Sequence, residues 1–230
     1  MYIDRIFQSV KALANTDGRG NFKPSTFNLH LYNSILEKFE GYVYDINQEV
    51  NRENRGLING GLENIPDKIR QKVAHFLKSG TITHASGLYA LPEDLRYFDT
   101  IVDGTDNMFE TCKDMNEFNI IKSVNAAAQY PIYIKIGTNI KVAPSTITGN
   151  LIIYYLRNPL YPKWTFTVVD NAELFNPSAG DFQDVDMHPS EEDDLVIRVC
   201  QKFGISLKEP DLQASMQNQE QIEFNQNKST

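Results

Sequence analysis

The sequence predicts an α+β fold with an N-terminal helical bundle, a small antiparallel β-sheet or sandwich, and a C-terminal helix followed by an extended or helical tail. Three observations support this prediction. Apolar residues recur at spacings of three and four through the first third of the chain, as in helices that bury one face. Short β-branched and aromatic runs, separated by glycine and proline, follow them. Near the end, a proline, a serine and four acidic residues form a strong helix start.

These patterns divide the chain into four regions. We expect a helical bundle over 1–80, a β-rich domain with a short inserted helix over 81–187, a helix over 188–207 and a Gln/Asn-rich docking tail over 208–230. The whole chain has 230 residues, 41% of them hydrophobic, so it can form one sizeable core or two smaller ones.

Three helices are expected in the N-terminal region. The first covers 1–14 and ends at a turn-rich segment that contains Gly18 and Gly20. The second begins near Ser25, a good N-cap, and has an apolar face formed by Leu31, Ile35, Phe39, Tyr42, Ile46 and Val50. The third begins at Pro66 and ends at Gly80, with an inward face formed by Ile69, Val73, Phe76 and Leu77.

The middle of the chain predicts short strands around one helix. The helix begins at Asn116, its expected cap, and continues through Val124, with Phe118 facing inward. The strands are rich in β-branched and aromatic residues and are bounded by glycine and proline. They are expected at 87–91, 97–102, 132–136, 140–142, 151–156 and 164–169.

The C-terminal helix has the clearest start and stop signals in the sequence. Ser190 is the expected N-cap, Asp193 stands at the capping-box distance, and Gly204 is the expected end. The sequence after Pro210 has too few apolar residues to fold alone. We therefore expect its apolar residues to dock on a partner, and they are Leu212, Met216, Ile222 and Phe224.

Motifs for chemistry are absent from the sequence. There is no phosphate-binding loop, and Gly18-Arg19-Gly20 is interpreted as a turn. Cys112 and Cys200 lack any CxxC or Cys/His spacing, so we expect two buried, reduced thiols. The histidines show no paired metal spacing and are expected in loops or on helix surfaces; they are His30, His75, His84 and His188. We therefore expect no enzyme and no catalytic, cofactor-binding or metal-binding residues.

Two groups of acids were considered as sites. The group Asp181, Asp184 and Asp186 lacks the spacing of an EF-hand loop, so a solvated acidic loop is the preferred interpretation. The pair Glu93-Asp94 follows Leu-Pro at a strand exit, where both acids are expected to face water. Neither group predicts catalysis.

Net charge and length restrict the partners. The formal charge is −8, which argues against tight binding to nucleic acid. No apolar run approaches the roughly 18 residues that span a bilayer, and the start lacks a signal-peptide pattern, so we expect a cytosolic origin and no membrane partner. Aromatic residues make up 11% of the chain, and core and interface packing is their expected use.

Several motifs in the second half resemble a known family. They are Tyr130–Gly137, Ile140–Pro144, Leu151–Pro159 and Pro162–Trp164, preceded by the strand exit Leu91–Leu95. Together they resemble the β-region of head-to-tail connector proteins of short-tailed bacteriophages. The ending resembles that of ring proteins of crAss-like phages, on His188–Glu192, Leu195–Leu207 and Glu209–Leu212.

This resemblance implies a structural virion protein without catalytic residues. It implies a homo-oligomeric ring of twelve subunits under the portal protein, with the C-terminal segment docked on the portal or a neighbouring ring protein. An acidic surface suits a channel wall past which DNA moves without specific binding. Two alternatives remain open at this point: a β-sandwich module that binds carbohydrate or protein, and an enzyme with an unrecognised site.

Overall fold

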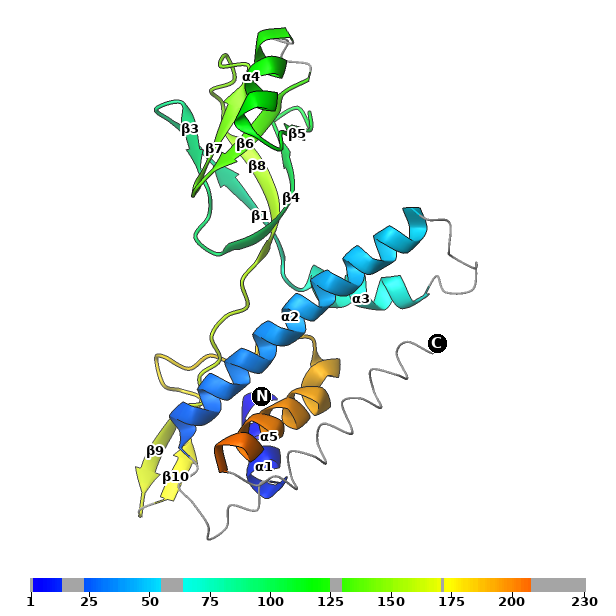
Figure 1. The fold of residues 1–230 in the computed structure, drawn as a ribbon. Coiled ribbons are helices and arrows are strands. Elements are labelled where there is room, and N and C mark those ends of the chain that lie inside the picture. The colour runs from blue at the N-terminus through cyan, green and yellow to red at the C-terminus, as the bar shows by residue number, and fades with distance from the viewer. Residues whose placement is uncertain (1, 14–22, 55–63, 125–129, 171, 208–230) are drawn as a thin grey trace. The chain divides into compact units, whose positions relative to one another are not determined.

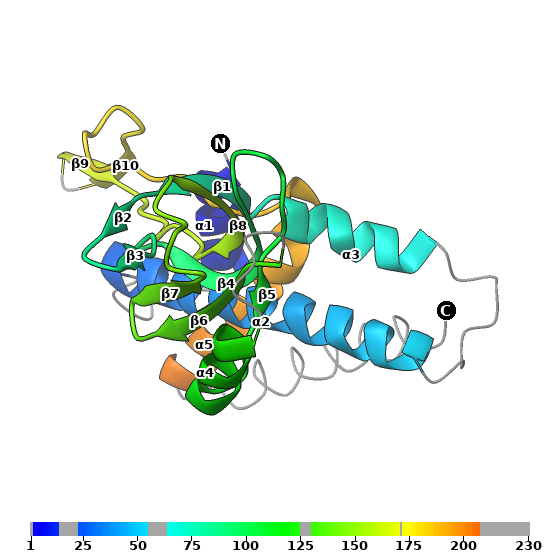
Figure 2. The same ribbon diagram turned by 90° about the horizontal axis from the view of Figure 1, so that it is seen from above.

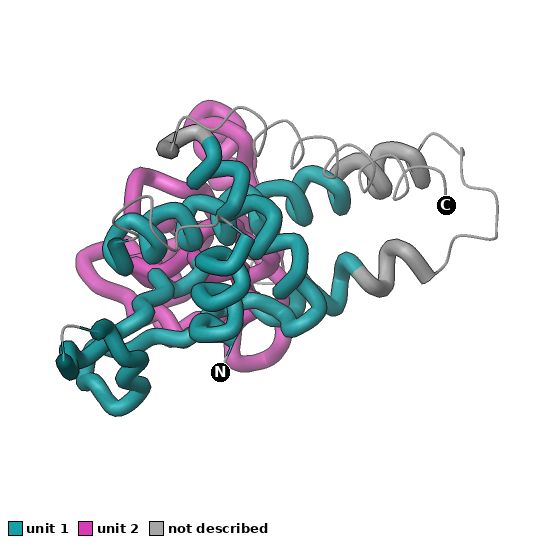
Figure 3. The backbone as a smooth tube through the Cα atoms, turned by 90° about the horizontal axis from the view of Figure 1, so that it is seen from below, with its two compact units in different colours: residues 1–75, 159–230 teal, residues 76–158 magenta. Residues whose placement is uncertain are grey.

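The computed structural model describes residues 2–13, 23–54, 64–124, 130–170 and 172–207. The chain divides into two compact units, which are residues 1–75 with 159–230 (unit 1) and residues 76–158 (unit 2), as Figure 3 shows. The predicted α+β fold is confirmed, because helices at both ends of the chain accompany antiparallel and mixed sheets.

Unit 1 is built mainly from helices (Figure 1). They are α1 (Tyr2–Leu13), α2 (Pro24–Asn54), α3 (Asn64–Ala74), the 3-10 turn η1 (Pro189–Glu191) and α5 (Glu192–Leu207). Helix α5 packs against both α1 and α2, and α3 packs against α2. The three- and four-residue spacing of apolar side chains places them together in this core, including Ile3, Ile6, Val10, Leu31, Ile35, Phe39, Leu195, Val199 and Phe203.

A two-stranded hairpin, β9 (Phe166–Val169) and β10 (Ala172–Phe175), also belongs to unit 1. Trp164 anchors its base, because this side chain is buried and its ring stacks on Phe7 with 3.9 Å between ring centroids. The Trp164 backbone N–H donates to Asn28 Oδ1 at 2.9 Å, and its indole N–H donates to Asp4 Oδ1 at 3.0 Å. These contacts tie the start of the hairpin to α1 and α2.

Unit 2 contains a three-stranded sheet of order β1-β8-β4 and a five-stranded sheet of order β2-β3-β7-β6-β5. The strands are β1 (Leu77–Ile82), β2 (His84–Ala85), β3 (Leu88–Ala90), β4 (Leu95–Val102), β5 (Glu110–Thr111), β6 (Ile132–Ile136), β7 (Asn139–Ala143) and β8 (Leu151–Arg157). Neighbouring strands run antiparallel except β5 and β6. Helix α4 (Met115–Val124) lies beside β6 and buries Phe118 there (Figure 2).

The core of unit 2 consists of side chains that alternate along the strands. Tyr89, Ile101, Ile140, Leu151, Ile153 and Tyr155 are all buried in one cluster. The Tyr89 hydroxyl donates to the backbone oxygen of Gly149 at 2.9 Å, which satisfies its one polar group. Six expected strand runs coincide with β3, β4, β6, β7, β8 and β9.

The predicted end of the third helix, at Gly80, is wrong. Helix α3 ends at Ala74, and the following residues, including Leu77 and Gly80, form strand β1. This strand pairs with β8 from Leu77↔Leu156 to Ile82↔Leu151. The helical spacing of the apolar residues was therefore outweighed by a ladder to a partner strand far along the chain.

Three helix ends also differ from the prediction. The cap of α4 is Asp114, whose Oδ1 accepts from the Glu117 N–H at 2.8 Å, and not Asn116. The turn before α5 is capped by the His188 ring, which accepts from the Ser190 N–H. Helix α5 continues through Gly204 to Leu207, so Gly204 is not its end.

The division into units differs from the predicted regions as well. Residues 159–187 were expected in the β-rich region, whereas they belong to the helical unit with α5. The physical reason is burial, because the Trp164 ring in this segment packs on Phe7 of α1. Hydrophobic patterning identifies such residues as buried, but it does not identify the core in which they are buried.

Candidate interaction surfaces

The four residues predicted to dock on a partner, Leu212, Met216, Ile222 and Phe224, lie outside the described residues. Within the described part of the chain, polar and charged side chains gather in three places: around Glu191, around Asp186, and around Asp94. Exposed apolar side chains gather in two others, the β9–β10 hairpin and the outer side of α4.

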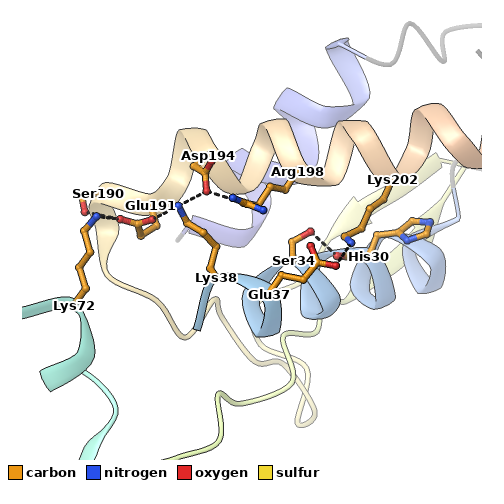
Figure 4. Close-up of polar contacts among 10 residues, drawn as sticks. All are labelled: His30, Ser34, Glu37, Lys38, Lys72, Ser190, Glu191, Asp194, Arg198 and Lys202. Carbon is orange, nitrogen blue, oxygen red and sulfur yellow. Dashed lines mark hydrogen bonds and ion pairs between the residues drawn. The ribbon is translucent and has the colours of Figure 1, made fainter. Parts of the chain in front are cut away.

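The first place is a buried ionic cluster around Glu191, drawn in Figure 4. The Glu191 side chain is only 3% exposed, and Lys38 Nζ lies 2.8 Å from its Oε2. Lys72 also binds Glu191, from α3. Asp194 accepts from Arg198 Nε at 2.9 Å and is paired with Lys38 as well. The cluster therefore connects α2, α3, the η1 turn and α5.

The charges in this cluster determine its protonation. Burial alone would raise the pKa of Glu191, but hydrogen bonds and charges from Lys38 and Lys72 outweigh it and lower the pKa to about 2. Asp194 behaves in the same way, because Lys38 and Arg198 lower its pKa against the effect of burial. Both carboxylates are therefore ionised at neutral pH. An acidic group with such firmly held partners fixes helices in place and is a poor proton donor or acceptor.

The sequence interpretation missed this cluster. It assigned the acids after Pro189 to the capped, positive first turn of a helix, whereas the Glu191 side chain is buried in unit 1. Lys38 could have indicated the cluster, because it lies between Ile35 and Phe39 on α2, which are both buried. A charge in such a position needs an acidic partner nearby. The sequence separation of Lys38 from Glu191 is too large for spacing alone to reveal the pair.

The second place is the expected acidic loop, which is solvated only in part. Asp186 is buried, and its Oδ2 accepts from the Leu160 N–H at 2.8 Å, while its Oδ1 lies 3.1 Å from His75 Nε2. Asp184 Oδ1 accepts from the Ile3 N–H at 2.9 Å. An acid at that position complements the positive N-terminus of α1. These two acids hold backbone segments together, so the prediction of a solvated loop was wrong for Asp184 and Asp186, whereas Asp181 is exposed as expected.

The third place lies in unit 2. Asp94 was expected to face water, yet its Oδ1 accepts from the Tyr155 hydroxyl at 2.8 Å and its Oδ2 from Lys78 Nζ at 2.7 Å. Burial alone would raise the pKa of Asp94, and hydrogen bonds from Lys78 and Tyr155 outweigh it and lower that pKa. The neighbouring Glu93 is exposed, as expected. The three bonded side chains come from β1, β8 and the turn before β4, and they stabilise the three-stranded sheet.

The β9–β10 hairpin has apolar side chains exposed on both of its faces. Opposite residues share a face, so Phe166 and Val168 lie on one side, and Val169 and Leu174 lie on the other. Their exposed fractions run from 40% for Phe166 to 63% for Val168. Figure 1 shows β9 and β10 as a separate ribbon near the start of α2. Within the described residues, each strand pairs only with the other.

The outer side of α4 is the second exposed apolar surface. Ile120 is 64% exposed and Val124, one turn later, is 82% exposed. Tyr130, which follows the helix in the chain, is also largely exposed. The opposite side of α4 covers β6, so these residues form the solvent face of a helix whose inner face is already used.

Groups suited to chemistry are not brought together in the described part of the molecule. In these ranges, no cluster of three or more His, Cys, Asp or Glu side chains is arranged to hold a metal ion. Cys112 and Cys200 are free and buried, as expected, and burial raises the pKa of Cys200 to about 12. None of the described helices has the length and apolar character needed to cross a membrane.

Comparison with known proteins adds no relative. No family model matches the chain, and no curated protein matches it.

Proposed function

We propose that this chain is a structural subunit of a bacteriophage particle, one protomer of a ring in the connector that joins the portal to the tail. The motifs between Leu91 and Leu212 suggest this class of protein. The observation that carries the proposal is the β9–β10 hairpin, whose apolar residues are exposed on both faces. Apolar side chains that are exposed on both faces of a hairpin are best explained by a protein partner that covers them.

The arrangement of charge supports an assembly role for the rest of unit 1. The ionic cluster of Glu191, Asp194 and Lys38 joins segments from both ends of the chain. Because breaking such a buried network is costly, the helices keep their relative positions under load. A ring that connects a filled capsid to a tail needs this property, whereas an enzyme would need ionisable groups that are open to a substrate.

The proposed partners follow from the same class. The subunit forms a homo-oligomeric ring of twelve copies, contacts the portal protein and neighbouring tail ring proteins, and surrounds a channel through which DNA passes without specific binding. It assembles in the host cytoplasm and resides in the virion. The apolar residues Leu212, Met216, Ile222 and Phe224 provide the contacts by which the tail docks. This role requires no cofactor.

Mass photometry of the purified chain, alone and mixed with the portal protein from the same genome, tests the proposal. We expect a discrete species near twelve times the 26.2 kDa mass of the chain, formed alone or on the portal. A persistent monomer in both samples would contradict the connector role and favour the β-sandwich binding module, for which a glycan array is the next measurement.

Deletion of 208–230 tests the docking tail. We expect the shortened chain to fold normally, because α5 and the core it helps to form end before this segment. Attachment to the portal should be lost. Circular dichroism checks the fold, and mass photometry with the portal checks attachment. Unchanged attachment would show that the tail has no docking role.

A further inference from the structure

The β9–β10 hairpin combines exposed apolar residues with acids that form no ion pair among the described residues. Val168 and Glu173 are directly opposite each other and share one face with Phe166. The segment Phe166–Phe175 contains Asp170 and Glu173 and no lysine or arginine. Neither acid forms an ion pair within the part of the chain that the structure describes. The hairpin is therefore mainly apolar, and its charge is negative.

A surface of opposite character exists on the same chain, in unit 2. The chain contains 30 acidic residues, yet none of them lies between Phe118 and Val169. Strands β6 and β7 both lie in this acid-free stretch. Their charge is therefore purely basic, in contrast to the protein as a whole, whose formal charge is −8.

The end of β6 and β7 next to their connecting turn presents this basic character together with an apolar side chain. Ile136 is 39% exposed there. Lys141 is opposite Ile134 on the neighbouring strand, so it lies on the same face of the sheet as Ile136. Lys135 lies on the opposite face, over the Phe98 ring, 5.7 Å from its centroid. Among the described residues, Lys141 forms no ion pair with an acid. We name Ile136 and Lys141 the basic turn surface.

We propose that the hairpin of one copy docks on the basic turn surface of a second copy. Val168 and Phe166 would cover Ile136, while Glu173 would approach Lys141. Charge complementarity selects this occupant, because the charged residues of the hairpin are both acids and the charged residue beside Ile136 on its face is Lys141. The inference rests on the proposed function, since it names the contact that builds the ring.

The two surfaces are different, so the contact is heterologous. A heterologous contact repeated from copy to copy closes into a ring when the rotation between copies allows it, and otherwise produces an open filament. Two hairpins meeting each other would instead bring like charges together and give a symmetric dimer. The charge pattern therefore favours a ring over a dimer.

Charge reversal in the full-length chain tests the contact. The variants are Glu173→Lys, Lys141→Glu and the double variant, with mass photometry over a series of concentrations, alone and with the portal protein. We expect each single variant to raise the concentration needed for assembly at least about tenfold, because each puts like charges in contact. The double variant should restore assembly, because it exchanges the two charges. Circular dichroism verifies that each variant folds.

Asp99→Lys is the matched control. Asp99 is an exposed acid on β4, a strand that belongs to neither surface, and its reversal changes the net charge by the same amount as Glu173→Lys. It should leave assembly near the wild-type level.

The outcomes separate this inference from the proposed function. If the wild type forms a ring and both single variants still form it, the proposed contact is wrong and the proposed ring is supported. Single variants that fail without rescue in the double variant would also overturn it. If the wild type forms a dimer or a filament that requires both Glu173 and Lys141, the contact is supported and the proposed ring is wrong. A wild-type monomer at every concentration, with and without portal, would overturn both.

Discussion

The helical body of unit 1 and the β9–β10 hairpin attached to it arrange their side chains in opposite ways. In the body, Glu191 is buried and its charge is paired, and the apolar Val199 is fully buried. In the hairpin, Glu173 has no ion pair among the described residues, and Val168 is exposed. The charge of Glu191 and the apolar surface of Val199 are therefore covered within the body, whereas Glu173 and Val168 are left uncovered in the hairpin. This difference directs the search for partners to the hairpin.

Removal of the side chain that joins the two regions should have the largest effect. Trp164→Ala deletes a buried indole that stacks on Phe7 and donates to Asp4. We expect a loss of about 4 kcal/mol in the free energy of unfolding, as for other large aromatic side chains in cores. Urea denaturation followed by circular dichroism measures it.

Phe166→Ala is the comparison for this variant. Phe166 is the first hairpin residue and is 40% exposed, so its truncation should cost less than half as much. Equal losses from the two variants would mean that the hairpin is part of the core, and the contrast between body and hairpin would fail.

A second variant tests whether the ionic cluster holds the body together. Glu191→Gln removes the charge that Lys38 and Lys72 share and leaves both cations near a neutral amide. We expect a loss of about 3 kcal/mol in the free energy of unfolding, since removing one partner of a buried pair leaves uncompensated charge. Urea denaturation at neutral pH is the measurement.

The matched control is Glu37→Gln on α2. Glu37 pairs with Lys202 at 2.6 Å, but its side chain is 52% exposed. Solvent-exposed pairs contribute little, so the loss should stay below about 1 kcal/mol. A Glu191→Gln variant as stable as this control would show that the cluster is incidental.

The two regions also differ in how far the sequence predicts them. The periodicity of Ile3, Ile6 and Val10 was enough to place α1, because a helix is defined by neighbours along the chain. The partners of Trp164 and of Glu191 are far away in sequence, so neither the hairpin anchor nor the ionic cluster was predictable from local patterns. The predicted docking residues lie beyond Leu207, outside the described residues.

Acid should weaken the body through the same cluster. The pKa of Glu191 is held at about 2 in the folded chain, below its ordinary value of 4.5. The unfolded chain therefore binds the proton first as the pH falls. The stability that Glu191 contributes is complete above about pH 5 and is lost as the pH approaches 2, by about 3 kcal/mol in total.

Urea denaturation of the wild type and of Glu191→Gln between pH 7 and pH 3 measures this loss. The two curves should converge as the pH falls, because the variant has no proton to bind at that position. Parallel curves would place the acid sensitivity in other carboxylates, such as Asp194 and Asp94.

The smallest effect on stability is expected in the hairpin. Val168→Ser changes a side chain that is 63% exposed, so the free energy of unfolding should stay within about 0.5 kcal/mol of the wild type. The same substitution at Val199, which is fully buried in α5, should cost about 3 kcal/mol. If the hairpin is an interface, Val168→Ser should nevertheless raise the concentration at which rings form. A variant that is stable yet defective in assembly separates the two regions, whereas one that is normal in both measurements leaves the exposed valine without a role in assembly.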